Sequence, residues 1–394
     1  MQIELRPYGR HGILNGRAGN RLVLWILADP HYLSPSLFDT QADAFRSILA
    51  VNSGKLIEHM PEVMEEFLSR ALREHPDAVL FPGDLTLNGE LEGLLEMGRM
   101  FSRLEAEGIR VLVIPGNHDI DCRYASVLTG DVASPAERVT RDAFFREMRR
   151  FGYDTTAARD EHSFSWIVPL ADDLRILGFD SNTNAFPGGI LNETLAWTEK
   201  ELTRAEAEGA AVITMMHHNL LVQNRFMETG FVLKNRTEVF DLLDHHGVML
   251  NLSGHIHLQH GSRKNSLTDI TTASAAVFPL GYSVLEIAEG HREWNYHRKY
   301  MTQFQDAALR RMYETCERFL QDTLDQLDVS EADRTCMRKA GQEVCVAVFA
   351  GWAYRPSDEE AKHGCRLWNE RASDTFWGKY IVSAIGQKHM EETI

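Results

Sequence analysis

The chain has 394 residues, of which 41 are Lys or Arg and 57 are Asp or Glu, so its formal net charge is −16 at pH 7. An acidic chain lacks the broad basic surface with which proteins bind long nucleic acids, and this argues against that class of partner. The composition, 44% hydrophobic and 25% charged, is typical of a globular protein, and the length exceeds that of a single core, which predicts two domains.

Up to about residue 290, short apolar runs alternate with longer amphipathic stretches. The runs are of strand length and are flanked by Gly, Pro, Asp or His, which is typical of strands buried on both faces. The expected strands are 22–28, 78–81, 110–114, 174–179, 211–216 and 248–252, with two more, either of which could be antiparallel, at 164–168 and 282–287. Residues 60–74 and 90–107 show helical spacing. The alternation predicts an α/β domain over residues 1–290.

After about residue 291 the pattern becomes helical. Apolar residues recur every three to four positions from Leu309 to Leu327, and Ser330 with Asp333 and Ser357 with Glu360 resemble capping boxes of two further helices. We therefore expect residues 291–394 to form an all-helical appendage that packs on the α/β domain. Its aromatic residues could form a homodimer surface, although core packing is the more common role of such residues. They are Trp352, Tyr354, Trp368, Phe376 and Trp377.

The same sequence predicts a cytoplasmic protein that does not associate with membranes. The apolar run 22–28 is at the short limit for a secretion signal and is followed by Asp29 instead of a small-residue cleavage site. No stretch approaches the roughly eighteen apolar residues that a membrane span requires. The five cysteines are odd in number and contain no C-x-x-C pair, which favours reduced thiols over disulfides or a thiolate zinc site.

Side chains that can bind metals follow five predicted strands in succession. The segments are Asp29-Pro-His31, Gly83-Asp84, Gly116-Asn117-His118-Asp119, His217-His218-Asn219 and Gly254-His255-Ile256-His257. Ligands of open α/β sheets bind at the carboxyl ends of the strands, so these segments can converge on one place. A single Asp or Asn after a strand is usually a turn residue or a helix cap, but five such segments are hard to explain in that way.

Two carboxylates, one carboxamide and four imidazoles make a suitable ligand set for a pair of transition metals. Mixed nitrogen and oxygen ligands without thiolates suit Mn, Fe or Zn and are too rich in nitrogen for Ca or Mg. Two adjacent cations repel each other, so an anion must bridge them, and Asp84 is the candidate. With neutral imidazoles and a bridging hydroxide, the site would stay weakly positive, which matches a phosphodiester monoanion.

The order D-x-H, G-D, G-N-H-D, H and G-H-x-H resembles the signature of the calcineurin-like metallophosphoesterases over about residues 22–290. The stretch from Asp84 to Glu90 further resembles the class III cyclic-nucleotide phosphodiesterase branch, some bacterial members of which carry a helical C-terminal extension. The resemblance implies a layered sheet sandwich flanked by helices. It also implies two divalent or trivalent metal ions (Mn, Fe or Zn), one held by Asp29, His31, Asp84 and His257 and one by Asp84, Asn117, His217 and His255.

The resemblance further implies a mechanism. A metal-bridging hydroxide attacks phosphorus in line, while His118 stabilises the transition state or protonates the departing alkoxide, and Asp119 orients His118. Asn117 and His218 are the candidate substrate contacts, although His218 could instead support the ligands from behind. Many relatives have Pro where this chain has Asn219, a departure that affects the loop and its substrate contacts but not the metal ligands.

The segment 121–161 is too long for an ordinary connection and is rich in Arg and apolar residues. Two interpretations stay open: a helical cap over the site, with Arg123 or Tyr124 on the substrate, and a solvated amphipathic helix.

The leading functional hypothesis is a metal-dependent phosphodiesterase that acts on a small phosphodiester, with a cyclic nucleotide as the first choice. A protein phosphatase is disfavoured, because that branch places an Arg after its G-D motif where this chain has Leu87, Asn88 and Gly89. A nuclease, a phosphomonoesterase or a pyrophosphohydrolase could use the same metals. A non-catalytic interaction module is the alternative from another class, but such relatives have usually lost several of the histidines that are present here.

Overall fold

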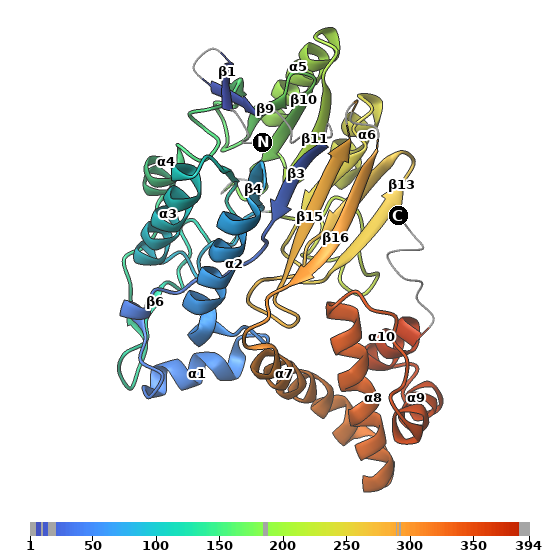
Figure 1. Cartoon of the computed structure of the whole chain (residues 1–394). Coiled ribbons are helices and arrows are strands. Elements are labelled where there is room, and N and C mark those ends of the chain that lie inside the picture. Colours follow the sequence, from blue (N-terminus) through green and yellow to red (C-terminus); the bar gives the residue numbers. More distant parts are fainter. Residues whose placement is uncertain are drawn as a thin grey trace.

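The computed structural model describes residues 5–8, 11–14, 21–183, 188–288, 290 and 293–385 of the chain (Figure 1). One sheet has five strands in the order β16-β15-β3-β4-β5. Strands β3, β4 and β5 are parallel, whereas β15 runs antiparallel to β3 and β16 antiparallel to β15. The strands are β3 (Arg21–Ile26), β4 (Ala78–Phe81), β5 (Arg110–Val113), β15 (Gly281–Ala288) and β16 (Trp294–Tyr300).

A second sheet has seven strands in the order β13-β14-β12-β11-β10-β9-β8. Its centre, from β10 to β14, is parallel, and the flanking strands β9 and β13 run antiparallel to their neighbours. The strands are β8 (Ala158–Arg159), β9 (Trp166–Ala171), β10 (Leu174–Phe179), β11 (Ala211–Met216), β12 (Leu250–Ser253), β13 (His260–Lys264) and β14 (Leu267–Thr271). Two short hairpins lie outside both sheets: β1 (Leu5–Tyr8) with β2 (His11–Leu14), and β6 (Ser126–Val127) with β7 (Ser134–Pro135).

The two sheets share one buried apolar core, and helices cover them from outside. The indole of Trp166 in the second sheet donates a hydrogen bond to the Val113 carbonyl of the first at 3.1 Å, which places the sheets in contact. Helices α2 (Met60–Glu74) and α3 (Leu91–Ala106) pack on the first sheet, where Phe67 lies 5.7 Å from Trp25 between ring centres. Helices α5 (Asn192–Ala207) and α6 (Arg236–His245) cover the second sheet through a separate apolar cluster (Figure 1).

This layered α/β sandwich confirms the fold class predicted from the sequence. The predicted strands are present within a few residues, and β9 and β15 are antiparallel as considered. The prediction missed β13, β14 and β16, and it missed α1 (Asp43–Val51), α5 and α6. Strand β16 alternates half-buried and exposed residues and carries His, Arg and Lys, so it lacks the continuous apolar run by which the other strands were recognised. The sheet therefore continues past residue 290.

Four helices follow from Gln305 onward and pack on the end of the sandwich (Figure 1). Their apolar faces join the core of the α/β body, with Met312, Leu320 and Val344 fully or almost fully buried. Trp368 and Tyr354 are also buried, whereas Trp352 and Phe376 are exposed. The helices are α7 (Gln305–Gln326), α8 (Glu331–Phe349), α9 (Glu359–Arg371) and α10 (Phe376–Ile385). Within the described residues, the helices are too short or too polar to cross a membrane.

One of the two predicted caps is correct. The Ser330 hydroxyl accepts a hydrogen bond from the Asp333 amide at the start of α8. The expected cap at Ser357 is wrong, because Asp358 takes that position and accepts from the Ala361 amide, while the Ser357 hydroxyl bonds Glu343. The division of the chain into domains at residue 290 stays a prediction.

Candidate metal centre

The five polar segments meet where strands of the two sheets end. Ligand atoms of Asp29, His31, Asp84 and His257 lie within 4.8 Å of one another, as do those of Asp84, His217 and His255, so Asp84 belongs to both groups. The carboxamide oxygen of Asn117 lies 2.8 Å from His217 Nε2, beside the second group. All seven residues predicted as metal ligands are therefore brought together, although the segments come from five different strands.

Most of these residues have a left-handed backbone conformation, with a positive φ. A positive φ is uncommon for a residue with a side chain and costs about 1 kcal/mol or more, so it persists where the surrounding structure imposes it. The affected ligand residues are Asp29 (φ 50°), His31 (φ 43°), Asp84 (φ 52°), His255 (φ 72°) and His257 (φ 60°). Such a backbone bends each loop, and this is how His255 and His257, two positions apart, can both face the site.

Two glycines are required by the close approach of the loops. A Cβ at Gly116 would lie 2.2 Å from Asp84 Oδ1, and one at Gly254 would lie 2.6 Å from Asp29 Oδ2. Both distances are far shorter than any van der Waals contact. The glycines of the Gly-Asn-His-Asp and Gly-His-x-His segments therefore make room for the two carboxylates.

Asp84 lies between the two groups. Its Oδ1 accepts a hydrogen bond from the His118 amide at 2.8 Å and lies 3.4 Å from His217 Nε2. Its Oδ2 points the other way and lies 3.6 Å from His31 Nε2. One oxygen thus faces each group of imidazoles, which is the arrangement that a carboxylate bridging two cations needs. Asp29 is fixed more simply, since both of its oxygens accept from the His255 amide, at 2.9 and 3.0 Å.

The orientation of two imidazoles is set by backbone carbonyls. His217 Nδ1 lies 2.9 Å from the Pro82 carbonyl, and His255 Nε2 lies 3.0 Å from the Gly230 carbonyl. A carbonyl oxygen can only accept, so these ring nitrogens carry protons and the other nitrogen of each ring faces the site. Such partners are characteristic of histidines that bind metals.

The electrostatics of the site favour neutral imidazoles. Burial lowers the pKa of His255 to about 4 and the pKa of His31 and His257 well below the usual value. His217 differs: burial opposes its charge, yet the adjacent carboxylate of Asp84 raises the pKa of His217 to about 9. Burial also raises the pKa of Asp29 to about 7.

The donor set fits a pair of transition-metal ions. The Nε2 atoms of His31 and His257 lie only 3.0 Å apart, and His31 Nε2 lies 3.6 Å from Asp84 Oδ2. A tautomer with the proton on Nδ1 of each ring would turn both Nε2 lone pairs toward a cation held beside this carboxylate. Nitrogen-rich ligation of this kind suits Mn, Fe or Zn.

The ring of His118 lies beside the site, with its centre 4.9 Å from that of His31. The expectation that Asp119 orients His118 is wrong. Asp119 Oδ1 accepts from the amide and hydroxyl of Thr86, and its Oδ2 accepts from the Gly116 amide, so the carboxylate ties two ligand loops together.

The His118 ring is held instead through Nδ1, which lies 2.8 Å from the Leu87 carbonyl and 3.1 Å from Asn88 Oδ1. These partners leave Nε2 available toward the site. Sequence reasoning treated Leu87 and Asn88 as replacements for a phosphatase motif and did not assign them this contact.

His218 supports the ligands instead of facing a substrate. It is only 5% exposed, its Nδ1 lies 2.8 Å from the Ser181 hydroxyl, and its ring centre lies 4.3 Å from that of His255. The predicted substrate contact is therefore corrected to a position behind His255. Asn219 donates to the Ser253 hydroxyl at 2.8 Å and so joins the two strand ends that carry His217 and His255.

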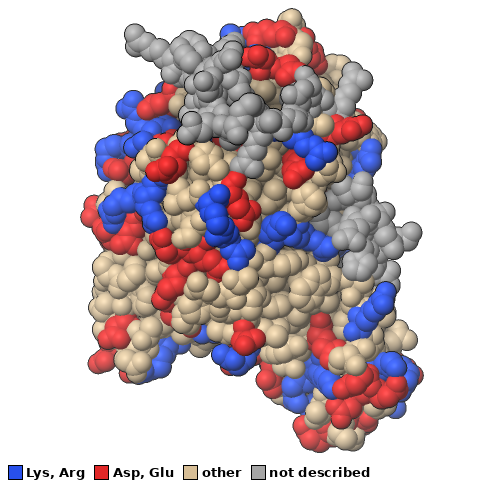
Figure 2. Space-filling model, viewed as in Figure 1, with Lys and Arg blue, Asp and Glu red and all other residues tan. Residues whose placement is uncertain are grey.

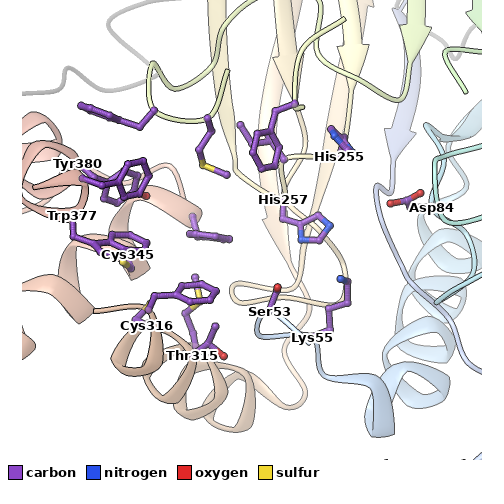
Figure 3. A pocket seen from close by; sticks show the side chains of 18 of the residues that line it. Ser53, Lys55, Asp84, His255, His257, Thr315, Cys316, Cys345, Trp377 and Tyr380 are labelled. Atoms are coloured by element: carbon purple, nitrogen blue, oxygen red, sulfur yellow. The ribbon is translucent and has the colours of Figure 1, made fainter. Parts of the chain in front are cut away.

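Lys55 is a site residue that the sequence did not indicate. Its side chain is 6% exposed and lines the same cavity as Asp84 and His257 (Figure 3). Burial lowers the pKa of its ammonium. The loop that carries it is held by α7, where Arg311 donates to the Lys55 carbonyl at 3.0 Å. A cation here lies where a substrate anion would approach the metals.

The interpretation of segment 121–161 as a cap is wrong. Helix α4 (Arg141–Met148) packs on α3, with Phe144 buried in the core. Arg123 lies over the ring of Tyr124, which is exposed, and the residues that line the cavity at the metal centre come from other segments. The structure favours the amphipathic helix, and the cavity is walled instead by the C-terminal helices.

Comparisons with known proteins agree with this geometry. A family model described as calcineurin-like phosphoesterase matches residues 22–259. The chain is 28% identical over 206 residues to a probable glycerophosphodiester phosphodiesterase GpdQ of Arcobacter nitrofigilis, covering 52% of this chain and 64% of that protein. It is 26% identical over 198 residues to a probable cyclic nucleotide phosphodiesterase of Rhodococcus erythropolis, covering 50% and 56%. The chain thus spans less than two thirds of these relatives.

A solved structure of a dimetal phosphatase from Danio rerio aligns with a TM-score of 0.48 at 13% identity, covering 70% of this chain and 98% of that one.

Replacing Asp84 by Asn should abolish metal binding. The Asp84→Asn variant keeps the size and one acceptor oxygen but removes the negative charge between the two cation positions, so we expect purified protein to fall from about two metals per chain to fewer than one. Elemental analysis by mass spectrometry measures the ratio. Asp172→Asn, at an exposed position, is the control. Two metals retained in Asp84→Asn would contradict the bridging position.

Proposed function

The chain belongs to the calcineurin-like phosphoesterase family, and from this premise we propose that it is a dinuclear-metal phosphodiesterase that hydrolyses a small phosphodiester, with a cyclic nucleotide as the first candidate. The observation that carries the proposal is the position of Asp84, with one oxygen toward His217 and the other toward His31. A pair of cations on either side of one carboxylate is the arrangement that such hydrolysis uses. The names of the relatives support phosphodiesters as the substrate class.

The metal pair, when bound, would polarise the phosphate and lower the pKa of a water. The residues of the chain supply the remaining parts. The Asn117 carboxamide, at the exposed side of the second group, can orient a phosphate oxygen. His118, with its Nδ1 proton held by the Leu87 carbonyl, directs Nε2 to the site. In its doubly protonated form, which burial disfavours and the Asp84 carboxylate favours, the ring can give the Nε2 proton to the leaving alkoxide. The Lys55 ammonium adds positive charge beside the substrate anion.

Of the other activities, hydrolysis of a glycerophosphodiester has specific support and nuclease activity is disfavoured. A glycerophosphodiester is the second candidate substrate, because one relative carries that name. A nuclease acting on long chains is disfavoured: among the described residues on the face in Figure 2, Lys and Arg alternate with Asp and Glu instead of forming a basic track. Phosphomonoester or pyrophosphate hydrolysis would use the same metal chemistry. The test below distinguishes these activities, and a non-catalytic module, from the proposed phosphodiesterase.

Turnover by metal-loaded protein tests the proposal. The full chain loaded with Mn, Fe or Zn should hydrolyse bis(p-nitrophenyl) phosphate and at least one natural diester, and removal of the metals by a chelator should abolish this activity. The panel contains 3′,5′- and 2′,3′-cyclic nucleotides, glycerophosphodiesters, dinucleotides and monoesters. Cleavage of monoesters or pyrophosphates alone would replace the phosphodiesterase proposal, and a fully loaded protein without turnover would favour the non-catalytic module.

Loss of the His118 imidazole should lower turnover without changing the metal content. We expect His118→Ala to keep both metals, since its backbone amide still binds Asp84, while kcat for a natural diester, whose alkoxide leaving group needs a proton, falls by about a hundredfold or more through loss of the proton donor. His162→Ala, at an exposed position, is the matched control. An unchanged kcat, or loss of the metals, would contradict the role given to His118.

The Lys55→Met substitution removes the positive charge of the ammonium but keeps a side chain of similar length. We expect kcat/KM for bis(p-nitrophenyl) phosphate to fall by roughly tenfold to a hundredfold, the effect of losing one charged contact to a phosphate. Metal content should stay the same. Lys299→Met, on the exposed side of β16, serves as the control. The same kcat/KM in wild type and Lys55→Met would show that Lys55 does not bind the substrate anion.

A further inference from the structure

A cavity of about 410 Å³ leads from the metal centre to the C-terminal helices. At one end lie Asp84, His118 and His255, with Lys55 beside them. At the other end lie Trp377 and Tyr380 of α10 and Cys316 of α7 (Figure 3). The volume is within the range of small-molecule sites, about 300 to 1,000 Å³. A substrate whose phosphate reaches the metals can therefore extend the rest of its structure between the two parts of the chain.

The far end of the cavity is apolar and rich in aromatic rings. The rings of Phe319 and Trp377 stack, with centres 5.9 Å apart and planes at 12°. Phe376 lies edge-on to Trp377, at 5.2 Å, and Phe226 approaches Tyr380 at 6.2 Å. Phe319 and Phe376 are 42% and 53% exposed, so the apolar lining continues to the surface of the molecule. Large apolar side chains kept open to solvent beside a site usually mark a place where a ligand binds.

Few polar atoms line this wall, and two of them are already engaged. The Thr315 hydroxyl accepts a hydrogen bond from the Arg318 guanidinium at 3.0 Å, and the Cys316 thiol hydrogen-bonds Cys345. A nucleobase has several donors and acceptors on its edge, and most of these would lose their water partners here, because beside the Tyr380 hydroxyl and the Trp377 indole the wall offers few groups to replace them. A hydrocarbon group loses no hydrogen bonds on entering and leaves water favourably. The lining therefore favours a hydrocarbon over a base.

We propose that this cavity binds a hydrocarbon group of the substrate, so that the site acts on phosphodiesters of an apolar, chain-bearing alcohol. The inference rests on the phosphodiesterase activity proposed above, and it places a diester of an apolar alcohol ahead of the cyclic nucleotide as the candidate substrate, because the lining of this cavity is apolar. The phosphate lies at the metal pair beside Lys55, and the chain extends past Thr315 toward Phe319 and Trp377. The C-terminal helices thus supply the selectivity for the alcohol.

A series of p-nitrophenyl alkyl phosphodiesters tests the inference. The alkyl group runs from methyl to hexyl, at concentrations below those at which micelles form, and the enzyme is the metal-loaded full chain. If the chain enters the cavity, kcat/KM should rise about fourfold for each added methylene, the effect of burying one CH₂ group. Trp377→Ala and Phe319→Ala should each lower the ratio of hexyl to methyl kcat/KM by several-fold. The ratio compares two substrates in one preparation, so partial misfolding cancels.

Trp352→Ala is the matched control, because Trp352 is also in the C-terminal part and 42% exposed but does not line the cavity. It should keep the wild-type ratio. Turnover of the methyl ester with no dependence on chain length would overturn the inference while the proposed phosphodiesterase stands. Absence of turnover with every ester would overturn both. A flat alkyl series, together with slower cleavage of 3′,5′-cyclic AMP by Trp377→Ala, would assign the cavity to a base and contradict the hydrocarbon.

Discussion

The carboxylate of Asp84 is the constraint on which the site depends. It is almost fully buried, and it stands between two sets of imidazoles contributed by both sheets. An ionised carboxylate in such surroundings is costly unless cations and hydrogen-bond donors surround it. The His118 amide provides one donor, the His217 ring lies 3.4 Å away, and the metal pair proposed above would supply the remaining stabilisation. The left-handed residues and the close-packed glycines are concentrated in the same loops, so the backbone departs from ordinary conformations where the ligands converge.

The sequence was sufficient to find the seven side chains that the structure brings together, because each motif directly follows a strand with a strong apolar signal. It could not identify the groups that orient them. Pro82 and Gly230 contribute only backbone carbonyls. Every residue type has a backbone carbonyl, so the sequence does not show which of them contacts a histidine. Asp119 was misjudged because adjacency in the sequence to His118 does not place the two side chains in contact. Lys55 was missed because its burial depends on α7, whose packing against the α/β body no local pattern reveals.

The C-terminal helices pack on the α/β body, as the sequence led us to expect, and they also line the cavity at the candidate metal centre. Their buried residues continue the core of the α/β body, while Phe319 and Trp377 face the cavity that begins at the metals. The segment 121–161, for which the sequence left a cap and a solvated amphipathic helix open, contributes no residue to the lining of this cavity. The site thus combines a metal centre built at strand ends with an apolar wall supplied by helices that follow the last strand, β16.

Anomalous diffraction from a crystal of the full chain grown with manganese tests the central claim most directly. The account predicts two manganese peaks, one on each side of the Asp84 carboxylate, the first beside His31 and His257 and the second beside His217 and His255. A single peak away from Asp84, or none at full manganese saturation, would contradict it.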